Sequence, residues 1–77
     1  MSLQTNATLD ARGLNCPLPI LRTRKALMGM ESGETLTVIS SDPGSVKDMS
    51  SFCTQTGDEL IENSSNEQEF IFIIRKQ

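Results

Sequence analysis

The apolar segment EFIFIIRK, residues 69–76, constrains the fold of this chain more than any other stretch. Successive side chains of a strand point to opposite faces, and here both faces are apolar. One face carries Phe70, Phe72 and Ile74, and the other carries Ile71 and Ile73. A strand that is apolar on both faces is typical of an interior position in a sheet. The segment therefore predicts a sheet in which this strand has a neighbour on either side.

The spacing of apolar residues predicts three further strands and two helices before this segment. The predicted strands are residues 7–10, 35–40, 58–63 and 69–76, and the predicted helices are residues 17–30 and 46–56. Gly33 and Gly57 are expected to end the helices, and Ser45 with Asp48 resembles a capping box at the start of the second helix. Residues 64–67 are polar and are expected to form a turn. The predicted order is βαβαββ.

This order predicts the fold class. A strand-helix-strand crossover is right-handed, so both helices are expected on one face of a four-stranded mixed sheet, in a two-layer α/β (α+β) sandwich. A chain of 77 residues makes one domain, expected to span residues 1–77 with an ordered core of about 6–76. Such a domain buries a thin core and has no room for a deep active-site cleft.

The first predicted helix carries two stripes of residues. The stripe expected to face the core consists of Ile20, Thr23, Ala26, Leu27 and Met30. The second stripe, roughly 100° away around the helix, consists of Pro17, Leu21, Arg24 and Met28. We expect the second stripe to be exposed. Alone it would be an ordinary solvated surface, but its closeness to Cys16 favours a docking face.

Composition and charge exclude several classes of function. The net charge is −3, and the chain has no Trp or Tyr, so it lacks the aromatic platform on a basic face that binds nucleic acid directly. No run approaches the roughly 18 apolar residues of a membrane span, and MSLQTNATLD has neither the basic flank nor the apolar centre of a signal peptide. We therefore expect a cytoplasmic protein without membrane contact. Its two cysteines are then expected to be free thiols.

Cys16 stands directly before the sequence Pro-Leu-Pro. Proline is favoured in the first helical turn, so Pro17 and Pro19 fit as the first and third residues of the helix, with Cys16 as the N-cap. A sulfur at the N-cap faces free backbone N–H groups and the positive end of the helix dipole. Both would favour the thiolate, which is the reactive form.

The surroundings of Cys16 in the sequence limit its chemistry. The chain has no histidine to act as a base, and the position of a second cysteine in a CxxC motif is Pro19. A metal site needs more soft ligands than Cys16 and Cys53, so no metal is expected. The remaining interpretation is a thiol that carries a small group. Two alternatives stay open: a non-catalytic regulatory domain in which Cys16 only caps a helix, and a redox switch that pairs Cys16 with Cys53. Cys53 shares a helical stripe with Val46 and Met49, which indicates a core position.

The segment LDARGLNCPLPILRTRKAL resembles the signature of the TusA/SirA-like small sulfur carriers, in which Cys-Pro-x-Pro opens the first helix. The resemblance continues through GETLTVISSDPGSVKDMSSFCTQTGDEL to FIFIIRK and covers residues 8–76. The phrase DMSSFCT is closer to the TusA branch than to the more divergent members. The complete set in this order and spacing is highly specific.

The resemblance implies a two-layer sandwich like the C-terminal domain of bacterial translation initiation factor three. It implies that Cys16, supported by Pro17 and Pro19, accepts sulfane sulfur from a cysteine desulfurase and passes it to a downstream relay protein. The covalent persulfide would be the only prosthetic group, and no other cofactor is expected. By position, the partner-binding residues would be Leu21, Arg24 and Asp42.

The resemblance also implies a pathway. In the TusA branch the relay ends in 2-thiolation of the wobble uridine of certain tRNAs, with links to molybdenum-cofactor synthesis and sulfur oxidation. Leu18 stands where members active in tRNA thiolation typically have Glu, and Asp58 stands in the place of a common His. Partner choice depends on such positions, whereas carriage of sulfur needs neither residue.

Overall fold

A computed structural model describes residues 6–77. Residues 1–5, which belong to the segment where no signal peptide is expected, lie outside the described residues. The elements are β1 (Ala7–Ala11), α1 (Leu18–Met28), β2 (Thr35–Ser40), α2 (Ser45–Thr56), β3 (Glu59–Ser65) and β4 (Phe70–Arg75). This is the predicted βαβαββ order. No helix in the described part of the chain is long and apolar enough to cross a membrane.

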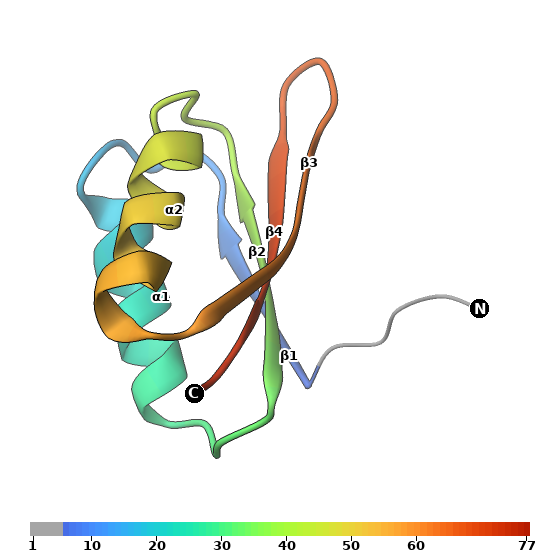
Figure 1. The fold of residues 1–77 in the computed structure, drawn as a ribbon. Helices are drawn as coiled ribbons and strands as arrows, with labels where there is room; N and C mark the ends of the chain where they lie inside the picture. The colour runs from blue at the N-terminus through green and yellow to red at the C-terminus, as the bar shows by residue number, and fades with distance from the viewer. Residues whose placement is uncertain (1–5) are drawn as a thin grey trace.

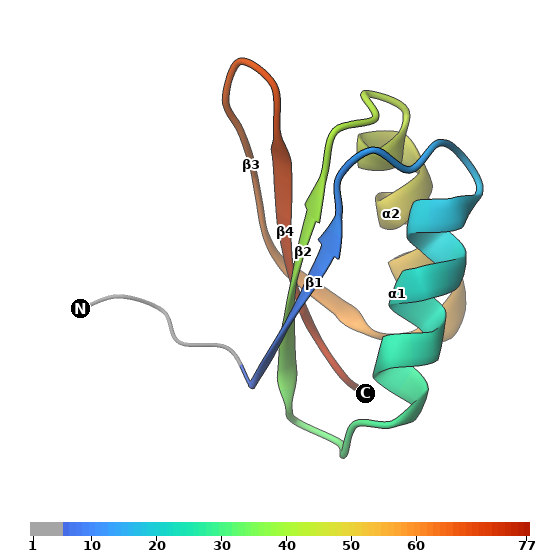
Figure 2. The same cartoon turned by 180° about the vertical axis from the view of Figure 1, so that it is seen from behind.

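The four strands form one mixed sheet in the order β1-β2-β4-β3. β1 pairs with β2 in parallel, and β4 pairs with β2 and β3 antiparallel. The predicted interior position of the last strand is thus confirmed. Both helices cover the same face of the sheet, which confirms the two-layer sandwich (Figures 1 and 2). They run in the same direction, because each begins where one of the two parallel strands ends.

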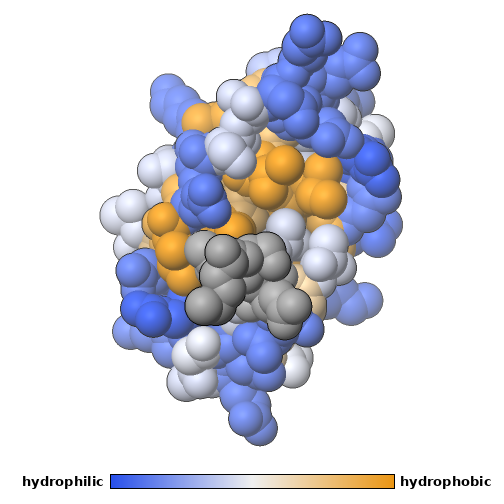
Figure 3. All heavy atoms as spheres, turned by 90° about the vertical axis from the view of Figure 1, so that its right-hand side faces the viewer, coloured by the Kyte–Doolittle hydropathy of each residue, from blue (hydrophilic) through white to orange (hydrophobic). Residues whose placement is uncertain are grey.

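The core lies between the helices and this face of the sheet. Its buried members are Ala11, Leu27, Leu36, Val38, Met49, Phe52, Cys53, Phe72 and Ile74. Ile20, Ala26 and Met30 pack against this cluster and Thr23 is buried, so the predicted core stripe of the first helix is confirmed. Alternation along β2 and β4 places Ile39, Ile71 and Ile73 on the opposite face of the sheet. Apolar side chains gather in the middle of that face, with hydrophilic ones around them (Figure 3).

The predicted end of the first helix is wrong. α1 ends at Met28 with Gly29 as its C-cap, because the Gly29 N–H donates to the Ala26 carbonyl oxygen at 3.2 Å and the Met30 N–H donates to that of Leu27 at 3.0 Å. These bonds close a tight turn before Gly33 is reached. Gly33, with φ of 90°, belongs to the loop before β2, where its N–H donates to the Lys76 carbonyl oxygen at 2.9 Å.

The predicted capping box is also wrong. α2 begins at Ser45, its N-cap is Gly44, and no side chain caps it. Ser45 is the first helical residue, not the N-cap, and its hydroxyl donates to the Asp42 carbonyl oxygen at 2.5 Å. Asp48 therefore does not form a capping box with Ser45. Gly57 ends α2 as predicted: its φ is 84°, and its N–H donates to the Cys53 carbonyl oxygen at 2.9 Å.

The β3–β4 turn lies further along the chain than predicted. Ser64 and Ser65 pair with Ile71 and Phe70, so they extend β3. The turn is closed by the Asn66 N–H, which donates to the Glu69 carbonyl oxygen at 2.9 Å. Polarity alone did not distinguish an edge-strand residue from a turn residue, because an edge strand tolerates polar side chains on both faces.

Candidate functional site

Cys16 lies in the loop between β1 and α1, two residues before the helix begins. The Leu18 N–H donates to the Asn15 carbonyl oxygen at 2.8 Å, which forms a turn, and the first i to i+4 bond runs from Leu21 N–H to Pro17 oxygen at 3.1 Å. Pro17 is therefore the N-cap, with φ of −98° and ψ of 16°, and Pro19 is the second helical residue. The prediction of Cys16 as N-cap and of Pro17 and Pro19 as first and third residues is wrong by one position, because the turn takes up Cys16 and Pro17. The Cys16–Pro17 peptide bond is cis.

Asp42 fixes the backbone of Cys16. One oxygen of its carboxylate, Oδ2, accepts from the Cys16 N–H at 3.1 Å, and the other, Oδ1, accepts from the Gly44 N–H at 3.1 Å. Close by, the Gly13 N–H donates to the Ser41 hydroxyl oxygen at 2.8 Å. The loops that follow the two parallel strands are thereby joined. The structure thus brings two of the predicted site residues, Cys16 and Asp42, into direct contact.

The thiol of Cys16 is exposed and lies at a groove between the two helices. The groove has a volume of about 270 Å³. It is lined by Cys16, Pro17, Ile20, Asp48, Ser51, Phe52 and Gln55. An apolar floor with a few polar groups and one exposed thiol is suited to receive a short piece of another protein rather than to enclose a small substrate.

The electrostatic surroundings of Cys16 differ from the prediction. Side-chain hydrogen bonding to the Asp48 carboxylate raises the pKa of the Cys16 thiol, and desolvation and the negative charges of Asp48 and Asp42 raise it further. The expected stabilisation of the thiolate by the helix N-terminus is therefore wrong for the free protein. Cys16 lies outside the first helical turn, and two carboxylates are its charged neighbours. The two carboxylates therefore disfavour the thiolate of Cys16.

Cys53 has a different environment. Its side chain is 4% exposed and belongs to the core cluster, which confirms the predicted core position. Burial, together with the negative charge of Asp58, raises the pKa of the Cys53 thiol to about 11. Both cysteines are free thiols. Only Cys16 is open to a reacting partner.

The remaining predicted residues divide between surface and core. Leu21 is 52% exposed and Met28 is 73% exposed, and Arg24 is exposed between them, so the exposed stripe of the first helix is confirmed. Pro19 is buried, and its carbonyl oxygen accepts from the hydroxyl of Thr23 at 2.8 Å. Pro19 therefore anchors the helix from inside, whereas Pro17 lines the groove beside the thiol.

Two residues of the site escaped the sequence reasoning. Asp48 was assigned to a capping box, and Phe52 was not placed at all. The signal for Phe52 was its position three residues after Met49, which extends the apolar face of α2 towards α1. Nothing in the local sequence pointed to the contact between Asp48 and Cys16, because they lie on different elements. Within residues 6–77, no group of three or more Cys, Asp or Glu residues is placed to hold a metal ion.

Comparison with known proteins places this chain in a family. A family model described as sulfurtransferase TusA matches residues 7–76, which is nearly all of the chain. This chain belongs to the TusA family. The sulfur carrier protein TusA of Allochromatium vinosum is 57% identical over 68 residues, which are 88% of this chain and 90% of that protein.

A solved structure agrees with the fold of the TusA family member described above. The crystal structure of the SirA-like protein from Desulfitobacterium hafniense has a TM-score of 0.79 and 27% sequence identity to this chain. The match covers 90% of this chain and 95% of that one. The resemblance to the TusA/SirA-like group is thus confirmed for both the sequence and the fold.

Proposed function

We propose that this protein is a sulfur carrier that holds sulfane sulfur as a persulfide on Cys16. The observation that carries the proposal is the exposed Cys16 thiol at the end of a shallow groove, in a chain whose other cysteine is buried. Membership of the TusA family supports it. The proposal requires no cofactor other than the covalently bound sulfur.

Loading is a thiol-persulfide exchange. The Cys16 thiol loses its proton, and the thiolate attacks the outer sulfur of a persulfide on a cysteine desulfurase. A bond forms between the Cys16 sulfur and that outer sulfur, while the sulfur–sulfur bond of the donor breaks. The donor cysteine leaves as a thiolate and takes up a proton. One sulfur atom is transferred from the donor to Cys16, and no external oxidant or reductant is consumed.

Unloading repeats the reaction with the roles exchanged. A thiolate of the downstream relay protein attacks the outer sulfur of the Cys16 persulfide, and the Cys16 thiolate leaves. Asp42 and Asp48 disfavour negative charge at this position. A persulfide is a stronger acid than the corresponding thiol, so the loaded carrier bears its charge beside these carboxylates. The departing Cys16 thiolate meets the same repulsion, which is relieved when the thiolate takes up a proton.

The proposal is tested by incubating the protein with a cysteine desulfurase and cysteine, followed by mass spectrometry of the intact chain. Wild type should gain the mass of one sulfur atom, and Cys16→Ser should gain none. Cys53→Ala is the matched control and should load like wild type. Sulfur on Cys16→Ser, or none on wild type, would contradict the assignment.

For the pathway, we propose a cytoplasmic relay that ends in tRNA 2-thiouridine synthesis, as in the TusA branch. Leu18 is 42% exposed beside the thiol loop, where a partner would meet it. Expression in a bacterium that lacks its own carrier should restore 2-thiouridine in tRNA, measured by nucleoside mass spectrometry. If wild type loads sulfur yet Leu18→Glu alone restores the modification, the protein supplies another relay, such as molybdenum-cofactor synthesis or sulfur oxidation.

A further inference from the structure

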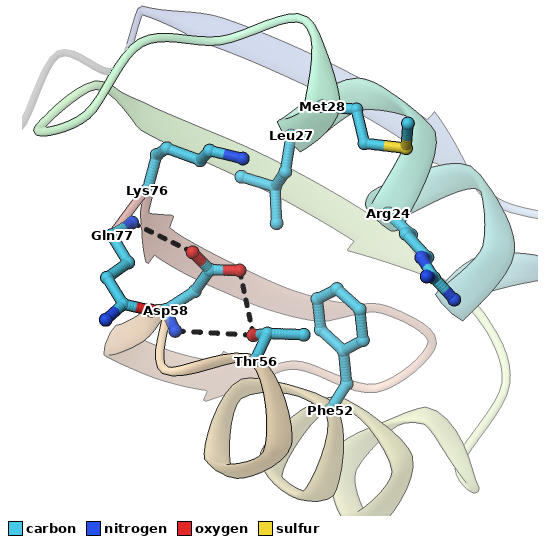
Figure 4. A pocket seen from close by; sticks show the side chains of 8 residues that line it. All are labelled: Arg24, Leu27, Met28, Phe52, Thr56, Asp58, Lys76 and Gln77. Carbon is cyan, nitrogen blue, oxygen red and sulfur yellow. Dashed lines mark hydrogen bonds between the residues drawn. The ribbon is translucent and has the colours of Figure 1, made fainter.

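A second hollow lies between the same two helices, at the end away from Cys16. Its volume is about 230 Å³. It is lined by Arg24, Leu27, Met28, Phe52, Thr56, Asp58, Lys76 and Gln77. Figure 4 shows the side chains of Arg24 and Lys76 on opposite sides of Leu27 and Phe52. The floor is thus apolar and the sides are cationic.

The two cations in this hollow are not neutralised by the rest of the protein. Among residues 6–77, neither Arg24 nor Lys76 takes part in a salt bridge. Asp58 also lines the hollow, but its Oδ1 accepts from the Gln77 N–H and its Oδ2 from the Thr56 hydroxyl, each at 2.8 Å. Both donors are uncharged, so the formal charges that line the hollow are two positive and one negative. The hollow is therefore net positive and attracts a carboxylate from outside.

The hollow adjoins the groove at Cys16. Phe52 lines both, and both are bounded by α1 on one side and α2 on the other. α1 has 11 residues and therefore spans about 16 Å. An extended peptide covers this distance with about five residues. At the far end Met28 is 73% exposed, and a flexible thioether of this kind adapts to varied apolar side chains.

We propose that the groove between α1 and α2 binds an extended segment of the protein that exchanges sulfur with Cys16. The reactive cysteine of that segment lies at Cys16, and a glutamate or aspartate about five residues away lies between Arg24 and Lys76. Charge complementarity at the far end selects an acidic residue over a basic one at that place in the segment, and the length of α1 sets the spacing. This proposal rests on the proposed function, since it takes Cys16 as the reacting thiol.

The test uses synthetic peptides whose cysteine is activated as a mixed disulfide with a chromogenic thiol. The Cys16 thiolate attacks the peptide sulfur, and the chromogenic thiolate leaves and is measured by its absorbance. One peptide carries Glu about five residues from the cysteine, a second carries Gln there, and a third carries Glu next to the cysteine. Each peptide is made in two versions, one with the Glu or Gln before the cysteine and one with it after the cysteine. The first peptide should react about threefold to fivefold faster than the other two at low salt, in at least one version.

Matched variants locate the effect. Lys76→Gln and Arg24→Gln should each reduce the advantage of the glutamate peptide. Arg22→Gln removes an exposed cation of α1 that does not line the hollow, and should keep the advantage. High salt should abolish the advantage in wild type.

The outcomes separate this proposal from the proposed function. Equal rates for all three peptides on wild type, or an equal loss with Arg22→Gln, would overturn the acidic-segment proposal. Sulfur loading of Cys16 by a desulfurase would still stand in that case. Failure of loading in wild type would instead overturn the proposed function.

Discussion

The different environments of the two cysteines predict how each thiol reacts with an alkylating reagent. Cys16 is exposed, whereas Cys53 is 4% exposed inside the core. We expect iodoacetamide at about pH 8 to attach one adduct per folded chain, at Cys16, because only a reachable thiolate reacts. A second adduct, at Cys53, should form only when guanidinium chloride unfolds the protein.

The size of the effect at Cys53 follows from its pKa. The folded protein raises this pKa from 9.0 to about 11, so below pH 9 the folded state holds about a hundredfold less Cys53 thiolate than the unfolded state. Restricted access adds to this factor, since the reagent reaches Cys53 only when the core opens. Alkylation of Cys53 should therefore accelerate by at least about a hundredfold on unfolding. Cys16 should accelerate far less.

The measurement is mass spectrometry of tryptic peptides sampled during the reaction. Cys16→Ser should give no adduct in the folded state, and Cys53→Ala should give one. The reasoning is refuted if folded Cys16→Ser is alkylated at Cys53 within about tenfold of its rate in denaturant. Such a result would show that Cys53 is a reactive thiol, and it would favour a redox switch between the two cysteines.

Three further perturbations test other features of the molecule. Asp48→Asn should lower the pKa of the Cys16 thiol, because it removes the leading cause of the upward shift. Alkylation of Cys16 at about pH 8 should then be faster than in wild type. An unchanged pH profile of alkylation would refute the contact between Asp48 and Cys16. Gly57→Ala should lower the free energy of unfolding by about 1–2 kcal/mol, because φ there is 84°. Thermal denaturation should show a lower Tm, and Gly44→Ala, at φ of −67°, is the near-neutral control. The folded pKa of Cys53 is raised, so its stabilising effect is complete below pH 9 and is lost as pH rises to about 11. Over this range, the free energy of unfolding measured in urea should fall more for wild type than for Cys53→Ala.

The fold could be predicted from the sequence because its signals are periodic. The two apolar faces of residues 70–74 required an interior strand, and β4 is interior. Helix and strand ends were less accurate, because they depend on single hydrogen bonds such as that between the Ser45 hydroxyl and the Asp42 carbonyl oxygen. The local pattern Cys-Pro-Leu-Pro predicted the helix start one residue too early. Only the turn from Asn15 to Leu18 fixed it.

The site was predicted less well, because its chemistry depends on contacts between distant elements. Cys16 was identified as the functional thiol by what the chain lacks, namely histidine and a neighbouring cysteine. The same reasoning considered only the helix start beside Cys16, and predicted a thiolate favoured by backbone N–H groups and the helix dipole. The structure supplies Asp48 from α2 and Asp42 from the preceding loop, 32 and 26 positions further along the chain. A local reading of a helix start therefore gave the wrong sign for the shift of the thiol pKa.

That reversed sign changes how the carrier should be regulated. A thiol with a lowered pKa would react readily with electrophiles in solution, whereas Asp48 raises the pKa of Cys16 and so lowers the share of reactive thiolate. A partner that brings a cation to Asp48 would lower the pKa of Cys16 only while it is docked, so activation and docking become one event. Replacing Asp48 with Asn should therefore speed the reaction of Cys16 with small free reagents more than its loading by a desulfurase. Equal acceleration of the two rates would show that docking contributes nothing to activation.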